Sequence, residues 1–390
     1  MRNIVCDVPA LRFPEFTGEW ERHKLSEVCS FYSGGTPSSS KKEYYNGNIP
    51  FIRSGELHKD YTELFITEAG LSNSAAKLVE TGDLLLALYG ATSGDIAISK
   101  IKGAINQAIL CIRTKQNKKF IESVWNKHVE RLLQTYLQGG QGNLSADIVK
   151  NIPFYFANSN EQDKLAKFIS LLDERIATQN KIIEKLETLI KGIVDSIFTA
   201  NEFPKVPFKE IYVRAGEGGT PATSNPEYYD NGTIPFIKID DLQNKYIKTN
   251  KDCITELGLQ KSSAWIVPAN SIIYSNGATI GAISINLFPV CTKQGILGVV
   301  PKADINVEFL YYFMTSTAFT KAVERIVTEG TMRTAYLKDI NHIPCPVPCS
   351  VKQDEIAKLL STLSEKLENE VIFQMKLQKQ KEFLLSQMFI

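Results

Sequence analysis

The chain contains the same series of motifs twice. Gly34-Gly35-Thr36-Pro37 returns 184 residues later as Gly218-Gly219-Thr220-Pro221. The motifs that follow keep their order in both copies: Glu-Tyr-Tyr at 43–45 and 227–229, Ile-Pro-Phe-Ile at 49–52 and 234–237, Ile-Thr-Glu-x-Gly-Leu at 66–71 and 254–259, and Gly-Ala-Thr-x-Gly at 90–94 and 277–281. This duplication predicts two similar units with an approximate internal symmetry. Duplex DNA is a common ligand whose backbone has two-fold axes of its own.

Length and charge limit the class of protein. A chain of 390 residues is too long for one hydrophobic core and suits two domains with connectors. Its 44 basic and 43 acidic residues nearly cancel, which excludes a polycationic DNA coat and an acidic disordered tail. If DNA is the ligand, locally placed side chains must contact it, or a partner must supply much of the affinity for phosphate.

Seven cysteines without a regular spacing indicate a reducing compartment rather than a disulfide framework. The first residues lack the apolar core of a signal peptide, and no apolar run approaches the roughly 20 residues that span a bilayer. We therefore expect a soluble, cytoplasmic protein that does not act at a membrane.

Each copy begins with a mixed segment of short apolar runs set between Gly, Pro, Ser and Asn. In the first copy the runs at 48–53, 83–89, 95–99 and 108–113 have the length and punctuation of strands. One amphipathic stretch, 119–137, is typical of a helix, and its counterpart is 307–327. An α+β domain with a strongly bent sheet is predicted in each half.

The second part of each copy has the pattern of a coiled-coil helix. Segment 159–198 contains no Pro, and its core-type positions alternate in steps of four and three. These stations are Leu165, Ile169, Leu172, Ile176, Gln179, Ile183, Leu186, Ile190, Ile193 and Ile197. Segment 350–389 repeats the pattern at an offset of 191. Both helices open with Ser-x-x-Gln, at Ser159 and Ser350, which predicts a capping box in which the Ser hydroxyl satisfies a backbone amide and Gln reaches back.

The second helix is less regular than the first. Glu370, Gln374 and Lys381 fall on its core stations, while apolar side chains such as Val371 and Leu385 lie nearby. Two interpretations stay open for its last half: contact with something other than a simple two-helix seam, or a helix tip in water.

Connectivity predicts how these parts are ordered. If the second helix packs on the first, the two must run antiparallel with a globular domain at each end, which is a pseudo-two-fold arrangement. About 38 residues at ~1.5 Å each make a spacer of roughly 57 Å, long enough to set a distance between two DNA contacts. The predicted boundaries are 1–158 for the first domain, 159–200 for the first helix, 201–349 for the second domain and 350–390 for the second helix. A coiled coil that serves only structure or oligomerisation is the alternative.

These motifs, in this order and followed twice by a long helix, resemble the specificity subunit of type I restriction-modification enzymes. The resemblance covers nearly the whole chain. It includes the lead-in Phe13-Pro14-Glu15-Phe16 with Trp20, the Asn/Lys-Gln pairs at 106–107 and 293–294, and Gln-Asp near the start of each long helix. The second helix has Lys352-Gln353 where the family pattern reads Glu-Gln, but the Gln remains.

The resemblance implies a protein without catalytic chemistry of its own. Each domain would be a target-recognition domain for one half of a split sequence in double-stranded DNA, and the helices would set the gap. Two adenine methyltransferase subunits would dock on the helices, and a translocating endonuclease subunit would join for cleavage. S-adenosylmethionine, ATP and Mg²⁺ would belong to those partners, with no cofactor on this chain.

Polar side chains near the repeated turns are the candidate DNA contacts. Hydroxyl and amide groups there can bind bases or phosphates, Arg can take guanine with two hydrogen bonds, and Lys supplies a point charge. Turn and solvent-exposed loop chemistry is the alternative for each of them. The candidates in the first half are Thr36, Lys41, Lys42, Arg53, Ser54, Tyr89, Thr92, Ser93, Asn106, Gln107, Gln141 and Asn143. Those in the second half are Thr220, Lys238, Asp240, Ser275, Asn276, Thr279, Lys293, Gln294, Thr331 and Arg333.

Apolar residues on or beside the core stations of the helices are the candidate partner contacts. They are Ile176, Ile183, Leu186, Ile190, Leu367, Val371, Leu377 and Leu384. His342, Cys345 and Cys349 carry metal-binding atoms, but prolines interleave them and no second pair follows, so no metal site is predicted.

Two further classes of function are weighed against a DNA-specificity subunit. A coiled-coil adaptor that organises a complex without DNA would show no sequence preference. A self-sufficient methyltransferase or nuclease is disfavoured, because the chain lacks the Asn/Asp-Pro-Pro-Tyr signature, a phosphate-binding loop ending in Gly-Lys-Ser/Thr and an obvious cluster of nuclease carboxylates. The target bases depend on loop conformation and DNA shape and do not follow from residue identities.

Overall fold

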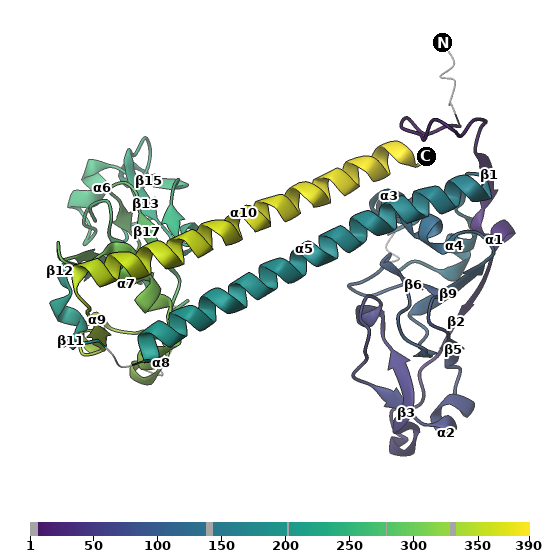
Figure 1. Cartoon of the computed structure of the whole chain (residues 1–390), viewed down its shortest axis with the longest axis horizontal. Coiled ribbons are helices and arrows are strands. Elements are labelled where there is room, and N and C mark those ends of the chain that lie inside the picture. Colours follow the sequence, from purple (N-terminus) through teal and green to yellow (C-terminus); the bar gives the residue numbers. More distant parts are fainter. Residues whose placement is uncertain (1–6, 138–142, 201–202, 278, 328–332) are drawn as a thin grey trace, which may run out of the picture. The chain divides into compact units, whose positions relative to one another are not determined.

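A computed structural model describes residues 7–137, 143–200, 203–277, 279–327 and 333–390. The chain divides into two compact units, one of residues 1–180 with 373–390 and the other of residues 181–372 (Figure 1). We call them unit 1 and unit 2 and describe each by itself. None of the described helices is both long enough and apolar enough to cross a membrane.

Unit 1 holds the first mixed domain. Its main sheet has the order β2-β9-β6-β7 and is antiparallel throughout. A second sheet has the order β4-β3-β8-β5, and β1 pairs with β10. The strands are β1 (Glu21–Lys24), β2 (Cys29–Ser33), β3 (Tyr45–Ile52), β4 (Phe65–Ile66), β5 (Lys77–Val79), β6 (Leu84–Ala87), β7 (Ile96–Ile98), β8 (Gly103–Ile105), β9 (Ile109–Thr114) and β10 (Pro153–Phe156). The helices are α1 (Leu25–Val28), α2 (Glu68–Ser72), α3 (Lys118–Leu137) and α4 (Ala146–Asn151), with short 3₁₀ turns η1 (Lys42–Tyr44) and η2 (Ser54–Glu56).

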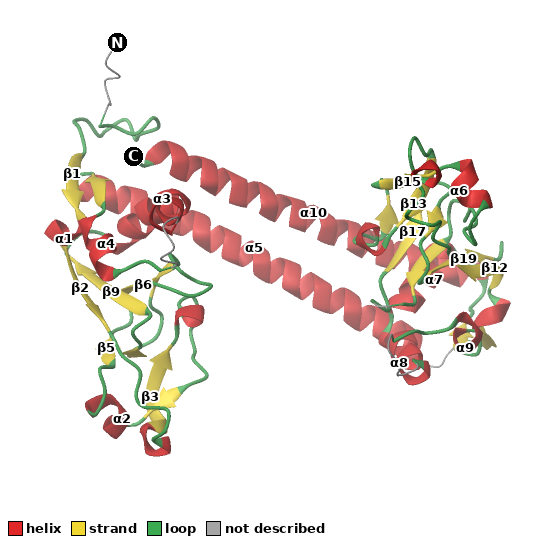
Figure 2. Cartoon of the chain, turned by 180° about the vertical axis from the view of Figure 1, so that it is seen from behind, coloured by secondary structure: helices red, strands yellow, loops and turns green. Residues whose placement is uncertain are grey.

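The domain of unit 2 also has two sheets (Figure 2), but its main sheet gains the edge strand β14 and, among the described residues, its smaller sheet lacks a counterpart of β5. Its main sheet has the order β12-β19-β16-β17-β14, and a smaller sheet has the order β15-β13-β18. The strands are β11 (Lys205–Pro207), β12 (Tyr212–Glu217), β13 (Ile234–Ile237), β14 (Tyr246–Ile247), β15 (Asp252–Ile254), β16 (Ile272–Ser275), β17 (Ile283–Asn286), β18 (Cys291–Thr292), β19 (Ile296–Pro301) and β20 (Pro344–Pro346). The helices are α6 (Glu256–Gln260), α7 (Val307–Thr315), α8 (Thr317–Ile326) and α9 (Leu337–Ile340), with 3₁₀ turns η3 (Phe208–Glu210), η4 (Pro226–Tyr228) and η5 (Ile239–Asp241).

Two packed sheets replace the single bent sheet that we predicted for each domain. The central strand β6 is apolar at every position, and alternate side chains face opposite ways. Leu84 and Leu86 pack with Phe120 and Trp125 of α3, whereas Leu85 packs with residues of the second sheet such as Ile52. Both faces of the main sheet are therefore buried, which explains why the run shows no polar alternation. The predicted α+β class and the predicted strands are confirmed.

The counterpart of α3 in unit 2 is two helices rather than the one predicted over 307–327. Ser316 has an extended backbone between α7 and α8, and its side chain caps α8 by accepting from the Phe319 amide at 3.3 Å. Its own hydroxyl donates to Phe313 O at 2.6 Å. A residue whose side chain satisfies the backbone in this way favours a helix break over continuation.

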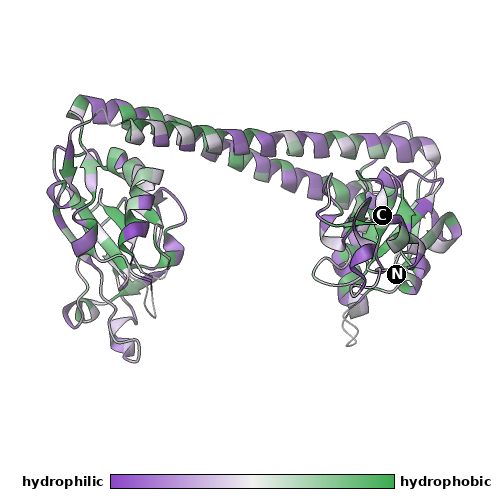
Figure 3. Ribbon diagram, turned by 90° about the horizontal axis from the view of Figure 1, so that it is seen from below, coloured by the Kyte–Doolittle hydropathy of each residue, from purple (hydrophilic) through white to green (hydrophobic). Residues whose placement is uncertain are grey.

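The long helices are α5 (Ser159–Thr199) and α10 (Ser350–Met388). Every predicted core station of α5 is buried or half-buried, and so is every station of α10 at the offset of 191. Hydrophobic residues recur along both helices between hydrophilic ones (Figure 3). Within unit 1, Arg175 lies over the ring of Phe373 and Asp173 pairs with Lys381, so this pair of segments runs antiparallel.

The last turns of α10 pack into the core of unit 1. Leu385, Met388 and Phe389 are buried, and the Phe389 ring lies 6.4 Å from Trp20 and 5.5 Å from Phe120. Lys381 pairs with Asp173 at 2.5 Å. Of the two interpretations left open for this segment, contact with something other than a two-helix seam is therefore correct.

The predicted capping boxes are wrong, although the glutamines matter. Ser159 is the first residue of α5, and the preceding Asn158 accepts from the Glu161 amide through Oδ1 at 3.0 Å. Gln162 points into the domain instead: its Nε2 donates to Ala157 O at 2.7 Å, and its Oε1 accepts from the Asn117 amide at 3.2 Å. The Gln162 side chain is therefore buried and bonded to the domain, and it does not cap its own helix as we predicted.

The same three residue types connect each long helix to its domain, and we call this arrangement the Asn-Gln-Asp link. In unit 1, the Asn117 Nδ2 donates to Asp163 at 2.8 Å, while its Oδ1 accepts from the Phe120 amide at the start of α3. Asn117 thus caps α3 while it is held by the first turn of α5.

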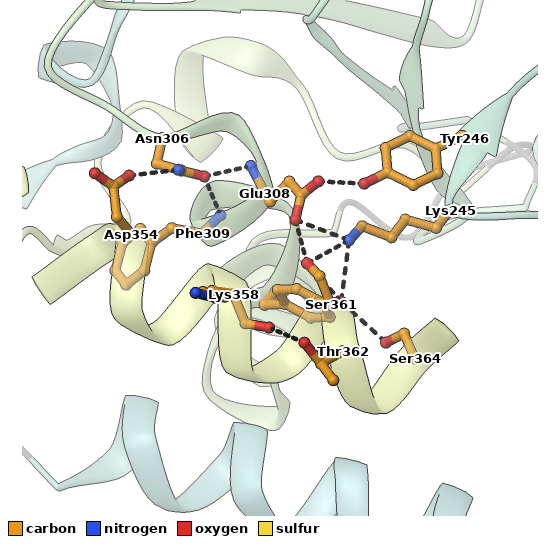
Figure 4. A network of polar contacts seen from close by, with 11 residues as sticks. Lys245, Tyr246, Asn306, Glu308, Phe309, Asp354, Lys358, Ser361, Thr362 and Ser364 are labelled. Carbon is orange, nitrogen blue, oxygen red and sulfur yellow. Dashed lines mark hydrogen bonds and ion pairs between the residues drawn. The ribbon is translucent and has the colours of Figure 1, made fainter. Parts of the chain in front are cut away.

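Unit 2 repeats the link, and Figure 4 shows its contacts between Asn306, Asp354 and the start of α7. Gln353 Nε2 donates to Pro348 O at 3.0 Å, and its Oε1 accepts from the Asn306 amide at 2.9 Å. Asn306 donates to Asp354 at 2.7 Å and accepts from the Glu308 and Phe309 amides. Gln162 and Gln353 are 2% and 1% exposed, so the loss of any of these bonds would leave a buried polar group unsatisfied.

One residue beyond the start of each domain helix, the two units differ in the sign of the charge. In unit 1, Lys119 of α3 pairs with Asp173 of α5 at 2.7 Å. In unit 2 the equivalent residue is Glu308, which pairs with Lys245 at 3.1 Å and accepts from the hydroxyls of Ser361 and Tyr246 (Figure 4). Burial opposes ionisation of Glu308, but these partners outweigh it and lower its pKa. The Asn-Gln-Asp link is therefore the same in both units, whereas the contacts of Lys119 and Glu308 differ between them.

The Gly-Gly-Thr-Pro turns have a structural requirement for glycine. A Cβ on Gly34 would lie 1.8 Å from Ile105 O, and one on Gly218 would lie 2.0 Å from Thr292 O. These contacts are with backbone atoms, which cannot move aside as a flexible side chain can. The first glycine thus lets the chain pass directly against the strand that precedes the Asn/Lys-Gln pair.

We predict that Gly34→Ala and Gly218→Ala each destabilise the protein by about 3 kcal/mol, because the backbone must shift to remove the clash. Gly192→Ala is the matched control, since a Cβ there meets nothing within 4 Å and lies inside α5. It should stabilise by about 0.5–1 kcal/mol through helix propensity. Urea unfolding of the three variants measures this, and equal effects at Gly34 and Gly192 would contradict it.

Candidate nucleic-acid interface

In each unit, segments distant in sequence meet at the loop that carries Gly-Ala-Thr-x-Gly. In unit 1 this loop joins β6 to β7 as a hairpin at the edge of the main sheet. The Leu144 amide donates to Leu88 O at 2.8 Å, and the Leu88 amide donates to Ala108 O at 2.8 Å. The hairpin therefore lies beside Asn143 on one side and the Asn106-Gln107 pair on the other.

Unit 2 brings the equivalent segments together. The Ala335 amide donates to Asn276 O at 2.9 Å, which places the hairpin beside the segment that contains Arg333. The Gly277 amide donates to Gly295 O at 3.2 Å, next to Lys293 and Gln294. The sequence predicted these residues as contacts from separate motifs, and the structure gathers them into one cluster of loops.

The Gly-Gly-Thr-Pro turns join the same cluster. Thr36 Oγ1 donates to Gln107 Oε1 at 2.6 Å in unit 1, and Thr220 Oγ1 accepts from the Gln294 amide at 3.3 Å in unit 2. Tyr45 and Tyr229 donate to the carbonyls of Pro37 and Pro221, each at 2.6 Å. The tyrosines of the repeated motifs are thus scaffold that holds the turns.

The candidate residues divide by exposure. Those with exposed side chains are Thr36, Lys41, Lys42, Arg53, Gln107 and Asn143 in unit 1 and Asp240, Thr279, Lys293, Gln294 and Arg333 in unit 2. Those that are half-buried are Ser54, Tyr89, Thr92, Ser93, Asn106, Thr220 and Lys238. Gln141 and Thr331 lie outside the described residues.

Two predicted contacts are corrected by burial. Ser275 and Asn276 are 2% and 1% exposed, and Asn276 Nδ2 donates to Ala335 O at 3.1 Å. Side chains in this position support the loop and cannot reach a base. Ser93 and Asn106 also bond within their own loops, to Leu88 O at 3.0 Å and the Ala108 amide at 3.0 Å.

Arg53 is engaged by carboxylates rather than free to bind guanine. Its guanidinium pairs with Glu56 at 2.8 Å and Glu63 at 2.9 Å. Its counterpart Lys238 pairs with Asp252 at 2.9 Å. Burial opposes ionisation of Glu56, but hydrogen bonds from Arg53 and Thr62 outweigh it and lower its pKa to about 2. The predicted base contact by Arg53 would require this network to open, so the structure does not support it.

Most of the predicted partner contacts are not exposed. Apart from Val371, they are buried or half-buried, with Leu377 at 6% exposure. Ile190 packs against the core of unit 2, and Leu384 packs against the core of unit 1. The exposed apolar side chains of α5 and α10 are Leu171, Ile182, Leu189, Val351, Leu359, Val371, Ile372, Phe373, Met375 and Phe383. Of these, only Val371 was predicted as a partner contact. All of them lie off the four-three pattern of core stations, so an apolar residue outside that pattern is the sequence signal for an exposed one.

The residues considered for a metal site do not form one. Cys345 is buried, and its thiol lies 3.6 Å from Ile343 O. In the described part of the chain, no three His, Cys, Asp or Glu side chains gather closely enough to hold a metal ion.

We predict that Glu56→Gln lowers the free energy of unfolding at pH 7 by roughly 3 kcal/mol, from 1.36 kcal/mol per pKa unit. The folded pKa of Glu56, about 2, lies below its ordinary value of 4.5. Its stabilisation is therefore complete above pH 4.5 and is lost as the pH falls toward 2. The difference between wild type and variant should shrink over that range in urea unfolding. Glu63→Gln, at an exposed partner of the same Arg53, should cost under about 1 kcal/mol at any pH.

Comparison with known proteins agrees with this duplicated architecture. The sequence model described as "Type I restriction modification DNA specificity domain" matches twice, over residues 17–188 and 205–376. The MjaIX specificity subunit of Methanocaldococcus jannaschii is 24% identical over 94% of this chain and 92% of its own length. The HindI specificity subunit of Haemophilus influenzae is 31% identical over 39% of this chain and 34% of its own length.

Solved structures share the fold over nearly the whole chain. The S subunit of a type I restriction-modification system from M. genitalium matches with a TM-score of 0.59, at 16% identity, over 98% of this chain and 99% of its own. A structure from a study of type I complex assembly matches with a TM-score of 0.60, at 15% identity, over 94% and 96%. The relatives are named specificity subunits, in agreement with the prediction that this chain is not itself an enzyme. With both of its domains matched, the chain belongs to the type I restriction modification DNA specificity family.

Proposed function

We propose that this chain is the non-catalytic specificity subunit of a type I restriction-modification complex, in which each unit reads one half of a bipartite DNA site. The observation that carries the proposal is the pair of loop clusters. Their scaffold is the same in both units, from the glycine turns to the tyrosine and hairpin bonds. Their exposed side chains differ, with Asn143 in one cluster and Arg333 and Lys293 in the other. Two loop clusters with the same scaffold and different exposed side chains suit a protein that recognises two different DNA sequences.

The chemistry of these side chains fits base recognition. Arg333 is exposed and can donate two hydrogen bonds to guanine, while Asn143 and Gln107 can bind adenine through paired bonds. Because basic and acidic residues balance in the whole chain, such local contacts must provide the specificity.

We further propose that the helices set the gap between half-sites and carry the docking surfaces of two methyltransferase subunits. Leu171 and Phe383 in unit 1 are 55% and 60% exposed, and Leu189 and Leu359 in unit 2 are 51% and 50% exposed. Large apolar side chains left in water along a helix are typical of a surface that another protein covers. S-adenosylmethionine, ATP and Mg²⁺ would be bound by the methyltransferase and endonuclease partners.

We predict that Arg333→Ala relaxes the sequence preference of one half-site only, by about 1–3 kcal/mol at a single base pair. The measurement is footprinting and competition binding of the chain reconstituted with its methyltransferase. Wild type should protect two half-sites separated by a fixed gap. Lys209→Ala removes the same charge from an exposed position of unit 2 outside the loop cluster and should change neither half-site. One continuous protected site, or an equal change in both halves, would refute the proposal.

We predict that Leu189→Asp and Phe383→Asp each weaken assembly with the methyltransferase at least about tenfold, because each places a charge in a covered apolar contact. Both side chains are exposed in this chain, so its thermal unfolding should stay nearly unchanged. Asn180→Asp, at an exposed polar position of α5, is the control. Calorimetric titration measures the assembly, and full-strength binding by both variants would exclude these helix faces.

A further inference from the structure

The hairpin loop of unit 1 is bonded to a second segment by a histidine and an aspartate. His58 Nε2 lies 2.8 Å from Asp95 Oδ1. Asp95 is the last residue of the loop before β7, and its amide donates to Thr92 O at 2.9 Å, so it lies next to a candidate DNA contact. His58 follows η2, on the segment that leaves β3. Neither His58 nor Asp95 was among the predicted contacts.

The two residues come from segments that meet in the core between the two sheets. Leu57, directly before His58, is buried in the same hydrophobic cluster as Ala97 of β7. Alternate residues along an extended chain face the same side, so Asp95 faces the second sheet as Ala97 does. Lys100 Nζ also donates to His58 O at 3.0 Å. The pair therefore joins the hairpin loop to the rim of this core.

The opposite side of the loop rests on α3. Trp125 Nε1 donates to Gly94 O at 2.8 Å, and a Cβ on Gly94 would lie 2.8 Å from Val129. His58 and Trp125 thus contact neighbouring residues of the loop from the two sides of the main sheet. The indole of Trp125 does not titrate, whereas the imidazole of His58 changes its charge near neutral pH.

Unit 2 supports the same loop without a titratable side chain. Counted from the Ile-Pro-Phe-Ile and Gly-Ala-Thr-x-Gly motifs, the residues equivalent to the pair are Gln243 and Ala282. Shortly after Gln243 the chain pairs with β17 as the edge strand β14, and the Ile285 amide donates to Lys245 O at 2.7 Å. In unit 1, β7 is itself the edge of the main sheet. A side-chain contact in unit 1 thus takes the place of backbone hydrogen bonds in unit 2.

The charges around His58 favour its protonated form. They are Asp95 on the hairpin, Lys100 after β7, and Glu122 on α3, which itself pairs with Lys119. The bond to Asp95 raises the pKa of His58 above its ordinary value of 6.5, burial and Lys100 oppose this, and Glu122 adds to it. The ion pair is therefore complete below pH 6.5 and is lost as the pH rises through the folded pKa. Neutral His58 keeps one N–H for Asp95 but loses the ionic attraction.

We propose that His58 is a positioning residue for DNA recognition by unit 1, where its contact with Asp95 holds the hairpin loop in the conformation that meets the half-site. This rests on the proposed function. Recognition by unit 1 then weakens as histidine loses its proton, while recognition by unit 2 does not. The side chains of His58 and Asp95 are 64% and 36% exposed, so the effect is about two- to fivefold and not a loss of binding.

The first test is hydrogen–deuterium exchange of the full chain at pH 6 and pH 8, corrected for the intrinsic exchange rates. In wild type, the amides of residues 88–95 should be about two- to fivefold better protected at pH 6. His58→Gln introduces the residue of unit 2, which keeps a donor and does not titrate, so this difference should vanish. His23→Gln is the matched control, because His23 also pairs with glutamates and has a raised pKa but lies on β1. It should leave the loop as in wild type.

The second test is fluorescence anisotropy of the chain, reconstituted with its methyltransferase, on a duplex that contains the bipartite site. His58→Gln and Asp95→Asn should each bind about two- to fivefold more weakly than wild type at pH 6 and equally at pH 8, whereas His23→Gln should match wild type at both. In a footprint, the loss should be confined to the half-site that Arg333→Ala does not affect.

A ratio of wild-type to His58→Gln affinity that is the same at both pH values would overturn the inference, because the role of His58 would then be structural alone. Protection of the loop that does not depend on His58 would overturn it as well. If loop protection follows pH as expected but wild type protects no pair of half-sites, the proposed function is refuted and His58 remains the residue that positions the loop.

Discussion

The Asn-Gln-Asp link is the interaction on which the rest of the structure depends. Each long helix begins in the core of its domain, with Leu165 and Ile169 of α5 in unit 1 and Ile356 and Leu360 of α10 in unit 2, and hydrogen bonds fix its position there. Gln162 and Gln353 make these bonds from the first turn of each helix, where their amides are almost fully buried and bonded on both sides. A buried side-chain amide whose donor or acceptor lacks a hydrogen-bond partner costs about 1–3 kcal/mol. The helix can therefore take only those positions that keep these bonds. The asparagine of the link also starts the domain helix, so the position of that helix follows from the position of the long one.

The domain helix in turn supports the recognition loops. In unit 1, α3 covers one face of the main sheet and carries the hairpin through Trp125 and Gly94. A series of hydrogen bonds and packing contacts therefore connects the first turn of α5, through α3, to the loops proposed to contact DNA. If each domain contacts one half-site, as we propose, this connection would let the long helix position the loops that contact DNA.

The sequence predicted the scaffold well and the contacts less well. The strands at 83–89 and 108–113, the long helices and their core stations follow from apolar runs and periodicity, which are local signals. Gln162 and Gln353 were predicted to cap their own helices. Instead, each side chain hydrogen-bonds to backbone carbonyl and amide groups outside its helix. The break at Ser316 was missed because a serine bonding to its own turn looks, in sequence, like any polar residue of a helix.

By itself the sequence determined that the chain has two copies of one design, with a mixed domain followed by a long helix in each, because duplication and periodicity are properties of residue order. Only the tertiary structure decided which polar side chains are available for contact. Ser275 and Asn276 are buried, and Arg53 is held by Glu56 and Glu63. The physical reason is that burial and pairing depend on segments far apart in the chain, and charge alone does not reveal whether a partner stands beside it.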